Sequence, residues 1–467
     1  MAPAKNDIIE IEITGTTHDG SGVGRLGGLV IFIPACAQGD TVRAQLIHMK
    51  KNLAYARLIE VLKPSPSRIG LDCPVFYRCG GCAFRHIAYD KELEIKQQRV
   101  ADALQKIGGL EIVPEKILAC EETLGYRNKA QYPVALSNGE IQIGFYARAS
   151  HRIVGDDACL LQPRCFEQAL GAFRQWIGQS GVSIYNEADG TGLLRHIYLR
   201  LAQATGELMA CAVVNGDSIP QSEPLVRLLK SRCPQLKSVV LNVNTRSTNA
   251  ILGPRCELLW GAERITDILC GLKIELSPLS FYQVNRPQAE RLYGLAAEFA
   301  DLNGNLPHSN LPHSTLPHGG LLLDLYCGAG TIGLSMAGQA AKVIGVEAVA
   351  DAVEDARRNA RINGIKNAEF LCADATDAAC RLLAQGLRPD VVVIDPPRSG
   401  CSAQTISAIT QMSPARVVYV SCDPATLARD LALFGQSGYR CARVKPVDMF
   451  PRTAHVETVV LMTRVKD

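Results

Sequence analysis

This chain of 467 residues has no long apolar run and no strong excess of either charge. None of its uninterrupted apolar runs reaches the roughly 18 residues that a membrane-spanning helix requires. The amino terminus, MAPAKNDIIEIEI, becomes charged too soon for a signal peptide. The 49 basic and 46 acidic residues leave a formal net charge of +3, which neither indicates nor excludes a nucleic-acid partner. We therefore expect a cytoplasmic protein that does not enter a membrane.

The composition is that of a chain with several buried cores. Hydrophobic residues make up 47% of the sequence, and a chain of this length is typical of two or three domains. The patterns described below predict a small β-barrel over residues 1–63, an α+β region over residues 64–265 and an α/β domain over residues 266–467.

The first 63 residues have the alternating pattern of short β-strands. Ile9, Ile11 and Ile13 alternate with polar residues, and glycine-rich turns separate the strands that follow. This pattern resembles the TRAM domain, an OB-like barrel that is found on RNA-modifying enzymes. Barrels of this kind bind nucleic acid through basic and stacking side chains. The available cations are Arg25, Arg43, Lys50, Lys51 and Arg57. The alternative is that these charges are merely solvated.

Cysteine is plentiful, with 17 residues, and three of them lie within ten positions at Cys73, Cys79 and Cys82. Such a cluster in a long chain without secretion signals indicates metal ligation more than disulfides. A tetrahedral zinc site or an iron–sulfur cluster requires a fourth ligand, and Cys159 is our candidate in preference to Cys165. The spacing alone leaves zinc and iron–sulfur open.

The α+β region contains two further features. Residues 91–108 have the periodic apolar face of a helix that packs on a core. In GYRNKAQY, the aromatic residues Tyr126 and Tyr132 alternate with the cations Arg127 and Lys129. This mixture fits single-stranded RNA, in which bases stack on rings and cations meet phosphates. An ordinary polar strand is the alternative.

The α/β domain has five successive strands that each end at a polar or reactive residue. The five strands end at Cys327, Glu347, Asp374, Asp395 and Cys422. A parallel, doubly wound Rossmann-like sheet would gather these ends along one edge, where such sheets bind ligands. The last two strands of the chain are expected to form an antiparallel pair. The preceding residues, 303–319, repeat Leu-Pro-His three times, which predicts a surface loop; metal binding by its histidines is the alternative.

A glycine-rich turn indicates a nucleotide-like cofactor. Gly328, Gly330 and Gly333 form G-x-G-x-x-G, and Glu347 follows at the distance expected of a ribose-binding acid. This pattern fits NAD as well as S-adenosylmethionine. The segment 395–398, Asp-Pro-Pro-Arg, favours S-adenosylmethionine, because it resembles the D-P-P-x loop of nucleic-acid methyltransferases.

A thiol and a carboxylate would account for methylation at carbon 5 of uracil. Addition of the Cys422 thiolate to carbon 6 would make carbon 5 nucleophilic. Glu457 is the candidate base that then removes the proton from carbon 5. An ordinary thiol is mostly protonated at neutral pH, so we expect a nearby cation or the following helix N-terminus to lower the pKa of Cys422.

Together, these motifs resemble the RNA uracil-5-methyltransferase family over nearly the whole chain. The motifs are FYQVN at 281–285, DLYCG at 324–328, DPPR at 395–398, SCDPATLARD at 421–430 and HVE at 455–457. The resemblance implies Cys422 as the nucleophile and Glu457 as the base. It also implies an S-adenosylmethionine site made by Gln283, Tyr326, Gly328, Gly330, Glu347, Asp374 and Asp395.

The combination of this barrel with the four cysteines resembles that of the branch of this family that acts on 23S ribosomal RNA. That similarity implies a [4Fe–4S] cluster on Cys73, Cys79, Cys82 and Cys159, with zinc as the alternative. Transfer RNA is the alternative substrate. A protein that binds RNA without catalysis is the alternative of a different class. We expect a monomer.

Overall fold

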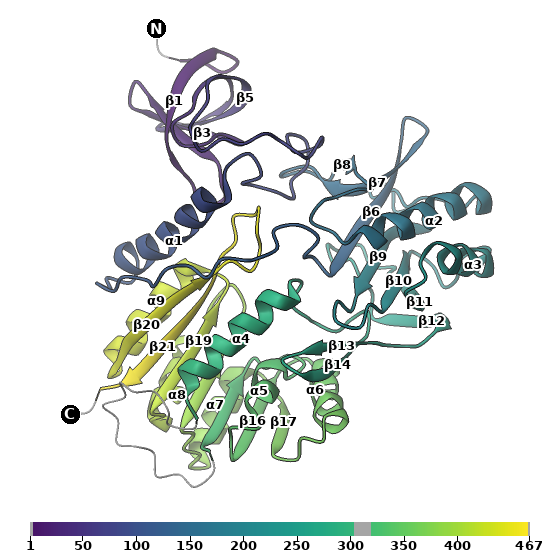
Figure 1. Cartoon of the computed structure of the whole chain (residues 1–467). Helices are drawn as coiled ribbons and strands as arrows, with labels where there is room; N and C mark the ends of the chain where they lie inside the picture. Colours follow the sequence, from purple (N-terminus) through teal and green to yellow (C-terminus); the bar gives the residue numbers. More distant parts are fainter. Residues whose placement is uncertain (1–2, 303–318, 466–467) are drawn as a thin grey trace.

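The computed structural model describes residues 3–302 and 319–465 (Figure 1). All but the last residue of the predicted Leu-Pro-His loop, 303–319, lies outside the described residues. The described residues form three sheets and a two-stranded hairpin. No helix in the described ranges is long and apolar enough to cross a membrane.

The first sheet is a closed barrel of five strands in the order β1-β2-β3-β5-β4. Ile9, Ile11 and Ile13 are buried inside it, because successive side chains of a strand point to opposite faces. The predicted barrel is therefore confirmed. Its strands are β1 (Ile8–Thr16), β2 (Gly22–Leu26), β3 (Leu29–Ile33), β4 (Thr41–Met49) and β5 (Leu53–Lys63).

The second sheet has seven strands in the order β12-β11-β10-β9-β6-β7-β8. Helices α2 (Arg164–Ser180) and α3 (Ser222–Arg232) pack on one face, with Phe173 and Trp176 fully buried in the core. The strands are β6 (Lys129–Ser137), β7 (Glu140–Tyr146), β8 (Ile153–Gly155), β9 (Leu194–Leu201), β10 (Leu208–Val214), β11 (Leu236–Val243) and β12 (Arg255–Gly261).

Alternate residues of β10 join the second sheet to the C-terminal domain. Leu208 and Ala210 point into the core beneath α2 and α3, whereas Met209 and Cys211 share a core with helix α4 (Arg286–Ala300). A strand buried on both faces is apolar throughout, as β10 is. The hairpin of β13 (Ile265–Leu269) and β14 (Leu272–Leu276) contributes to the same core.

The third sheet has the order β17-β16-β15-β18-β19-β21-β20. Its first five strands are parallel, and β21 and β20 are antiparallel, as predicted. The strands are β15 (Leu321–Leu325), β16 (Lys342–Glu347), β17 (Ala368–Cys372), β18 (Val391–Ile394), β19 (Arg416–Ser421), β20 (Tyr439–Val447) and β21 (Glu457–Arg464). The helices are α5 (Thr331–Met336), α6 (Ala350–Ile362), α7 (Ala375–Ala384), α8 (Ala403–Met412) and α9 (Pro424–Gln436).

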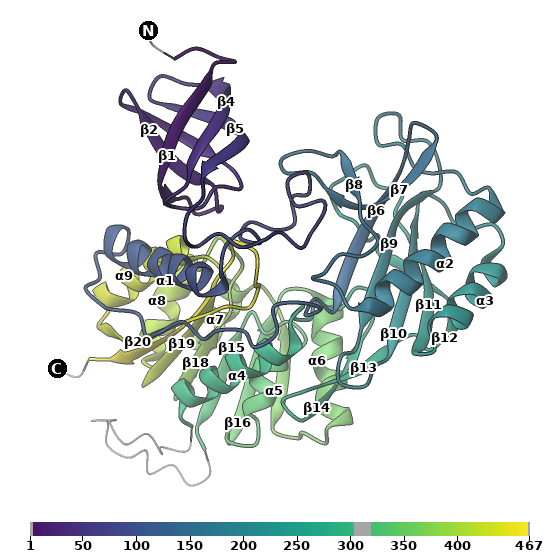
Figure 2. The same cartoon turned by 45° about the horizontal axis from the view of Figure 1, so that its top comes forward.

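Helix α1 (Tyr89–Lys106) lies between the barrel and the third sheet (Figure 2). Its buried residues Val100 and Leu104 share a core with Leu427 and Leu431 of α9. The predicted amphipathic helix is confirmed, and its apolar face is buried against the C-terminal domain rather than against the second sheet.

Candidate active site

A cleft of about 1300 Å³ opens at the carboxyl ends of β15, β16, β18 and β19. It is lined by all but one of the residues predicted for catalysis and cofactor binding. The lining residues among them are Gln283, Tyr326, Gly328, Glu347, Asp374, Asp395, Cys422 and Glu457. Parallel strands that end along one edge bring these distant residues together.

Gly330 is the predicted residue that does not line the cleft. It has φ +77° and precedes α5, and a Cβ atom there would lie 3.0 Å from the ring of Phe370 and 3.1 Å from Ala356. Gly330 therefore allows close packing behind the cleft wall. Gly328, with φ +54° and no atom within 4 Å of a Cβ position, is on the cleft side.

Glu347 is fixed to the glycine-rich turn by a hydrogen bond. The backbone N–H of Gly328 donates to Oε2 of Glu347 at 3.1 Å, and that of Val349 donates to Oε1 at 2.9 Å. Each carboxylate oxygen keeps further acceptor capacity. Asp374 is similarly held, because its side chain caps the N-terminus of α7. Both carboxylates are thus oriented before any ligand binds.

The 281–285 segment is held in place by Asn128, the residue that immediately precedes β6. Asn128 donates from its side chain to the carbonyl of Gln283 at 2.9 Å and from its backbone to the carbonyl of Val284 at 2.8 Å. Asn128 is buried. The central residue of the GYRNKAQY motif therefore positions Gln283 at the cleft.

Cys422 follows the last residue of β19 and is partly exposed at the cleft. Burial, together with the charges of Glu457 and Asp395, raises the pKa of its thiol to about 11, and Arg398 acts in the opposite direction. The N-terminus of α9 is capped by the side chain of Asp423. The expected net lowering of the Cys422 pKa is therefore wrong for the ligand-free protein, although a cation is nearby.

Glu457 begins β21 and is 5% exposed, so it is not an ordinary surface carboxylate. Burial, reinforced by Asp395, raises its pKa to about 8, against the opposing charge of Arg398. Burial also raises the pKa of Asp395 to about 7. A carboxyl group with a pKa near neutrality is suited to proton transfer.

Four cations line the cleft: Arg127, Lys129, Arg264 and Arg398. Burial and the neighbouring Arg200 and Arg127 lower the pKa of Lys129 to about 8. We predicted that both the cations and the aromatic residues of GYRNKAQY contact RNA. Arg127 and Lys129 do line the cleft, but the prediction is wrong for Tyr126 and Tyr132.

Tyr126 and Tyr132 are both buried, so neither can stack on a base. Tyr132 contacts the ring of Phe145 in the core, and Tyr126 donates to the carbonyl of Pro451 at 2.9 Å. The exposed Phe281 and the partly exposed Phe450 line the cleft instead.

Three rings form a row on the outside of the barrel. Phe32, Tyr55 and His48 are register partners on β3, β5 and β4, with ring centroids 5.5 Å and 6.1 Å apart along the row. Sequence reasoning missed this row. Strand alternation places Phe32 and Tyr55 outward, whereas a register shift between Leu46 and His48 turns His48 outward. Lys50 and Lys51 are exposed in the adjoining turn, and neither forms an ion pair with another described residue.

Arg43 differs from these lysines because it is already paired. Its guanidinium contacts Glu10 at 2.9 Å and Glu60 at 3.1 Å. Arg43 is therefore a weaker candidate for RNA contact than the sequence indicated, and Lys50 and Lys51 beside the ring row are stronger ones.

The four cysteines predicted as metal ligands share one neighbourhood. Burial and the charges of Cys159, Cys79 and Cys73 raise the pKa of Cys82 to about 12, and burial and the charges of Cys79 and Cys73 contribute to the raised pKa of Cys159. Cys165 belongs elsewhere, since it packs with the core of the second sheet.

The backbone around the cysteines is tightly packed. A Cβ atom on Gly80 would lie 2.9 Å from the backbone nitrogen of Arg148 and 3.0 Å from the carbonyl of Tyr146, so only glycine fits. The N–H of Gly81 donates to the sulfur of Cys79 at 3.3 Å. Within residues 3–302 and 319–465, no group of three or more Cys, His, Asp or Glu side chains is arranged to hold a metal ion. The four thiols supply the donor chemistry of a thiolate-bound metal.

Two protein families match the chain. The profile described as tRNA (Uracil-5-)-methyltransferase matches residues 314–465, and the TRAM domain matches residues 5–59. The first match includes Glu347, Asp395, Cys422 and Glu457 of the cleft.

Relatives match over nearly the full length. A protein of Halalkalibacterium halodurans, named as an uncharacterized RNA methyltransferase, is 40% identical over 98% of this chain and 97% of its own. A protein of Clostridium tetani with the same description is 38% identical over 99% of this chain and 98% of its own.

Among solved structures, the tRNA (uracil-54, C5)-methyltransferase of Pyrococcus abyssi, in complex with S-adenosyl-L-homocysteine, is similar over nearly all of this chain. Its TM-score is 0.78 at 27% identity, over 97% of this chain and 99% of the other. This similarity includes the barrel and the Rossmann-like domain, and it supports dependence on S-adenosylmethionine. The chain, an enzyme that methylates RNA, therefore belongs to the RNA uracil-5-methyltransferase family and carries a TRAM domain.

Proposed function

We propose that this enzyme transfers a methyl group to carbon 5 of a uridine in 23S ribosomal RNA through a covalent bond between Cys422 and the uracil. The observation that carries this proposal is the shared cleft of Cys422 and Glu457, in which the charge of one acts on the pKa of the other. The nucleophile acts at the first step of this reaction and the base at a later one, so both must reach the same uracil ring.

Methyl transfer through this covalent bond requires no oxidant. Cys422 would lose its proton to solvent and bond through its thiolate sulfur to carbon 6. The electrons displaced onto carbon 5 would form the new bond to the methyl group, whose bond to the sulfonium sulfur breaks, with S-adenosylhomocysteine as the leaving group. Glu457 then takes the proton of carbon 5, the carbon 5–carbon 6 double bond forms again, and the thiolate leaves. S-Adenosylmethionine supplies the electrophilic methyl group when it is bound.

The cleft residues give this cofactor a specific place. Glu347 is held by the N–H of Gly328 and keeps lone pairs for ribose hydroxyl groups. Gln283, Tyr326, Gly328, Asp374 and Asp395 would complete the cofactor site. Arg398 would favour the thiolate form of Cys422, since its charge already lowers the pKa of that thiol.

The RNA would be held at two places. In the cleft, Arg127 and Lys129 would meet phosphates beside the target nucleotide, which has to leave its stack to reach Cys422. On the barrel, the row of Phe32, Tyr55 and His48 would stack on bases, with the free lysines of the adjoining turn near the backbone. A ribosomal RNA substrate implies a cytoplasmic enzyme, and we expect it to act as a monomer.

We also propose that Cys73, Cys79, Cys82 and Cys159 hold a [4Fe–4S] cluster, with zinc as the alternative. Its role would be structural, because methyl transfer moves no net electrons. Anaerobically purified protein should be brown with broad visible absorbance. The variant Cys159→Ser should lose that colour, whereas Cys165→Ser should keep it. A colourless protein with stoichiometric zinc would exclude the iron–sulfur cluster.

Mass spectrometry of RNA treated with enzyme and labelled cofactor tests the main proposal. The label should appear on carbon 5 of uracil, and a label on adenine or cytosine would exclude this reaction. Cys422→Ala should abolish turnover. Glu457→Gln should accumulate RNA that remains covalently bound on a denaturing gel, because the proton on carbon 5 is not removed.

Transfer RNA is the second candidate substrate, and the Pyrococcus abyssi structure favours it. That protein is described as a tRNA methyltransferase and is similar over 97% of this chain, barrel included. Competition between the two RNAs in one reaction separates the candidates. Single-turnover labelling separates both from a protein that binds RNA without catalysis, because such a protein would transfer no label.

A further inference from the structure

The eight residues between β20 and β21 that immediately precede Val456, here called the 448–455 loop, lead directly to Glu457. Two of them, Phe450 and His455, line the cleft and contact each other edge to face with ring centroids 6.0 Å apart. The position of the loop therefore determines both the start of β21 and part of the wall that a target base would meet.

Residues from the N-terminal half of the chain hold this loop. Lys96 of α1 donates to the carbonyl of Phe450 at 3.1 Å, and Arg99 of α1 donates to the carbonyl of Ala454 at 2.8 Å. Tyr126 also reaches the loop, at the carbonyl of Pro451. These contacts come from outside the sheet to which the loop is connected.

Lys96 is the centre of a buried charge network. Its Nζ lies 2.7 Å from Oε1 of Glu92 and 2.6 Å from Oδ1 of Asp448, and all three side chains are 0% exposed. The hydroxyl of Tyr89 donates to the other oxygen of Asp448 at 2.6 Å. Asp448 is the first residue of the loop, so Lys96 binds the loop at both Asp448 and Phe450.

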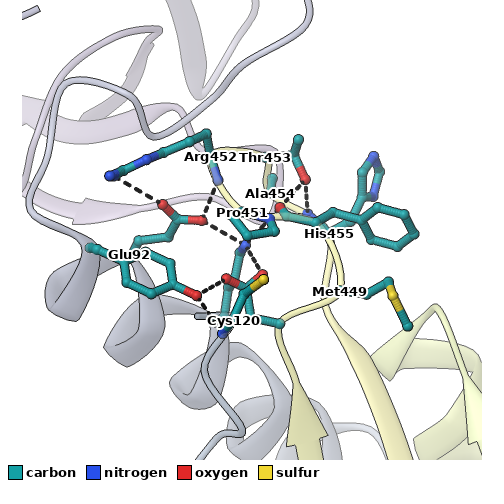
Figure 3. Close-up of polar contacts among 12 residues, drawn as sticks. Glu92, Cys120, Met449, Pro451, Arg452, Thr453, Ala454 and His455 are labelled. Carbon is teal, nitrogen blue, oxygen red and sulfur yellow. Dashed lines mark hydrogen bonds and ion pairs between the residues drawn. The ribbon is translucent and has the colours of Figure 1, made fainter. Parts of the chain in front are cut away.

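Arg452 connects the same network to the cysteine segment. Its backbone N–H donates to Oε1 of Glu92 at 2.7 Å, as Figure 3 shows, and its carbonyl accepts from the N–H groups of Ala83 at 2.8 Å and Phe84 at 3.0 Å. Its guanidinium lies 3.6 Å from Glu92. Arg452 has φ +69°, a left-handed conformation that a residue with a side chain adopts only at a cost.

The network is difficult to explain by stability alone. Two buried carboxylates face two cations, Lys96 and Arg452, so the charges balance. Balanced ions in a protein interior are nevertheless often no more stabilising than apolar residues of the same volume. What such ions can provide is a single defined geometry, because each bond length and direction is fixed. Here the geometry that they define is that of the 448–455 loop.

We propose that Lys96 is a positioning residue for proton removal: it fixes the 448–455 loop and thereby aims Glu457 at carbon 5 of the bound uracil. This inference depends on the proposed role of Glu457 as the base. Lys96 itself does not line the cleft. Its loss should therefore impair the step that uses Glu457 more than the binding of cofactor or RNA.

The test compares Lys96→Met with Glu457→Gln in the full-length protein. Lys96→Met should lower kcat about 100-fold and change KM for RNA by a much smaller factor; the effect on kcat is of a size typical of a misplaced reacting group. Methylated RNA should accumulate as a covalent adduct on denaturing gels, as it should in Glu457→Gln. Binding of S-adenosylhomocysteine should stay within about twofold of the parent protein.

A triple variant tests the proposal even if Lys96→Met alone fails to fold. Lys96→Met combined with Glu92→Gln and Asp448→Asn removes all three fully buried charges and leaves no uncompensated carboxylate. The remaining cation, Arg452, has a side chain that is 13% exposed and so keeps access to water. The triple variant should fold and still accumulate the adduct, because the donor to the carbonyl of Phe450 is missing. The matched control is Arg68→Met with Asp40→Asn. It removes another ion pair, at 2.8 Å, in which the carboxylate is fully buried and the arginine partly buried, and for which no contact with the loop is found among the described residues.

The results separate the two proposals. If Glu457→Gln accumulates no adduct, the proposed role of Glu457 fails. If Glu457→Gln accumulates adduct but Lys96→Met and the triple variant resolve it at the parent rate, Lys96 has no positioning role. The same conclusion follows if the triple variant loses activity only in proportion to its unfolded fraction, as the Arg68 and Asp40 control would.

Discussion

The carboxylate of Glu457 raises the pKa of the Cys422 thiol, and both side chains line the same cleft. The proposed base therefore opposes ionisation of the proposed nucleophile. Two groups that interact in this way release their protons in steps that belong to the pair rather than to either residue. Arg398 acts on both groups in the opposite direction.

Release of the methylated RNA from Cys422 should become faster as the pH rises through about 8. Burial raises the pKa of Glu457 to about 8, so this carboxyl group is mostly protonated below that pH and cannot accept the proton of carbon 5. The pKa of Cys422, raised to about 11, should make the earlier addition to carbon 6 faster with rising pH as well. The measurement is the product-release rate between about pH 6 and about pH 9. A flat profile would contradict the assigned roles.

Glu457→Gln should make the fold more stable than the parent at pH 8 and above. The pKa of this group is raised in the folded state, so the folded protein binds more protons than the unfolded chain between about pH 4.5 and about pH 8. The stability contributed by the protonated carboxyl is then lost as the pH rises through that window. Gln does not titrate, so the difference should grow to a few kcal/mol, about 1.4 kcal/mol per pH unit. Urea unfolding at several pH values measures it, and a difference that is independent of pH would contradict the prediction.

Arg398→Met should slow the reaction of Cys422 with iodoacetamide and move its pH dependence upward. Arg398 lowers the pKa of this thiol, so its removal reduces the thiolate fraction at a given pH. Arg264→Met is the matched control, because Arg264 lines the same cleft but pairs with Asp355 at 2.7 Å. Equal effects of the two variants would show that Arg398 has no specific influence on Cys422.

Glu347→Gln should weaken binding of S-adenosylhomocysteine roughly 10- to 100-fold, the loss expected for charged hydrogen bonds. The substitution removes the carboxylate that the N–H of Gly328 orients at 3.1 Å. Isothermal titration calorimetry measures the affinity. Glu369→Gln is the control, since Glu369 pairs with Lys342 on the surface. An unchanged affinity in Glu347→Gln would place the ribose elsewhere.

Tyr55→Ala should weaken RNA binding roughly 5- to 100-fold and leave the single-turnover rate at saturating RNA unchanged, because one stacked base contributes about 1 to 3 kcal/mol. Tyr55 is central in the ring row of the barrel and is 41% exposed. Ile59→Ala, on the same strand and 47% exposed, is the control. Filter binding at two salt concentrations measures both. An effect as large in Ile59→Ala would indicate no specific stacking.

The sequence predicted the parallel sheet because its signals are local. Each of Glu347, Asp395 and Cys422 follows a short apolar run, and parallel strands must bring such ends to one edge. The closed barrel was predictable for the same reason, since alternation at Ile9, Ile11 and Ile13 determines which face is buried.

What the sequence could not predict is the surroundings of a side chain that packs against distant residues. Tyr126 and Tyr132 have the spacing of an RNA-binding motif, yet the packing of other elements buries both. Lys96 has the pattern of a solvated helix residue, and its partner Asp448 is 352 positions away. The rise in the pKa of Cys422 is another case, because burial and the charges of distant residues outweigh Arg398.

The separation between Lys96 and Asp448 also bears on how the protein folds during its synthesis. A ribosome that adds about 5 to 20 residues per second needs roughly 20 to 70 s to pass from Lys96 to Asp448, since 352 positions separate them. Through that interval Glu92 and Lys96 lack their third partner, and α1 has no α9 to pack on. The barrel can close early, whereas α1 is expected to dock only when the last strands have emerged. Translation should therefore yield protease-sensitive α1 until nearly the final residue is added.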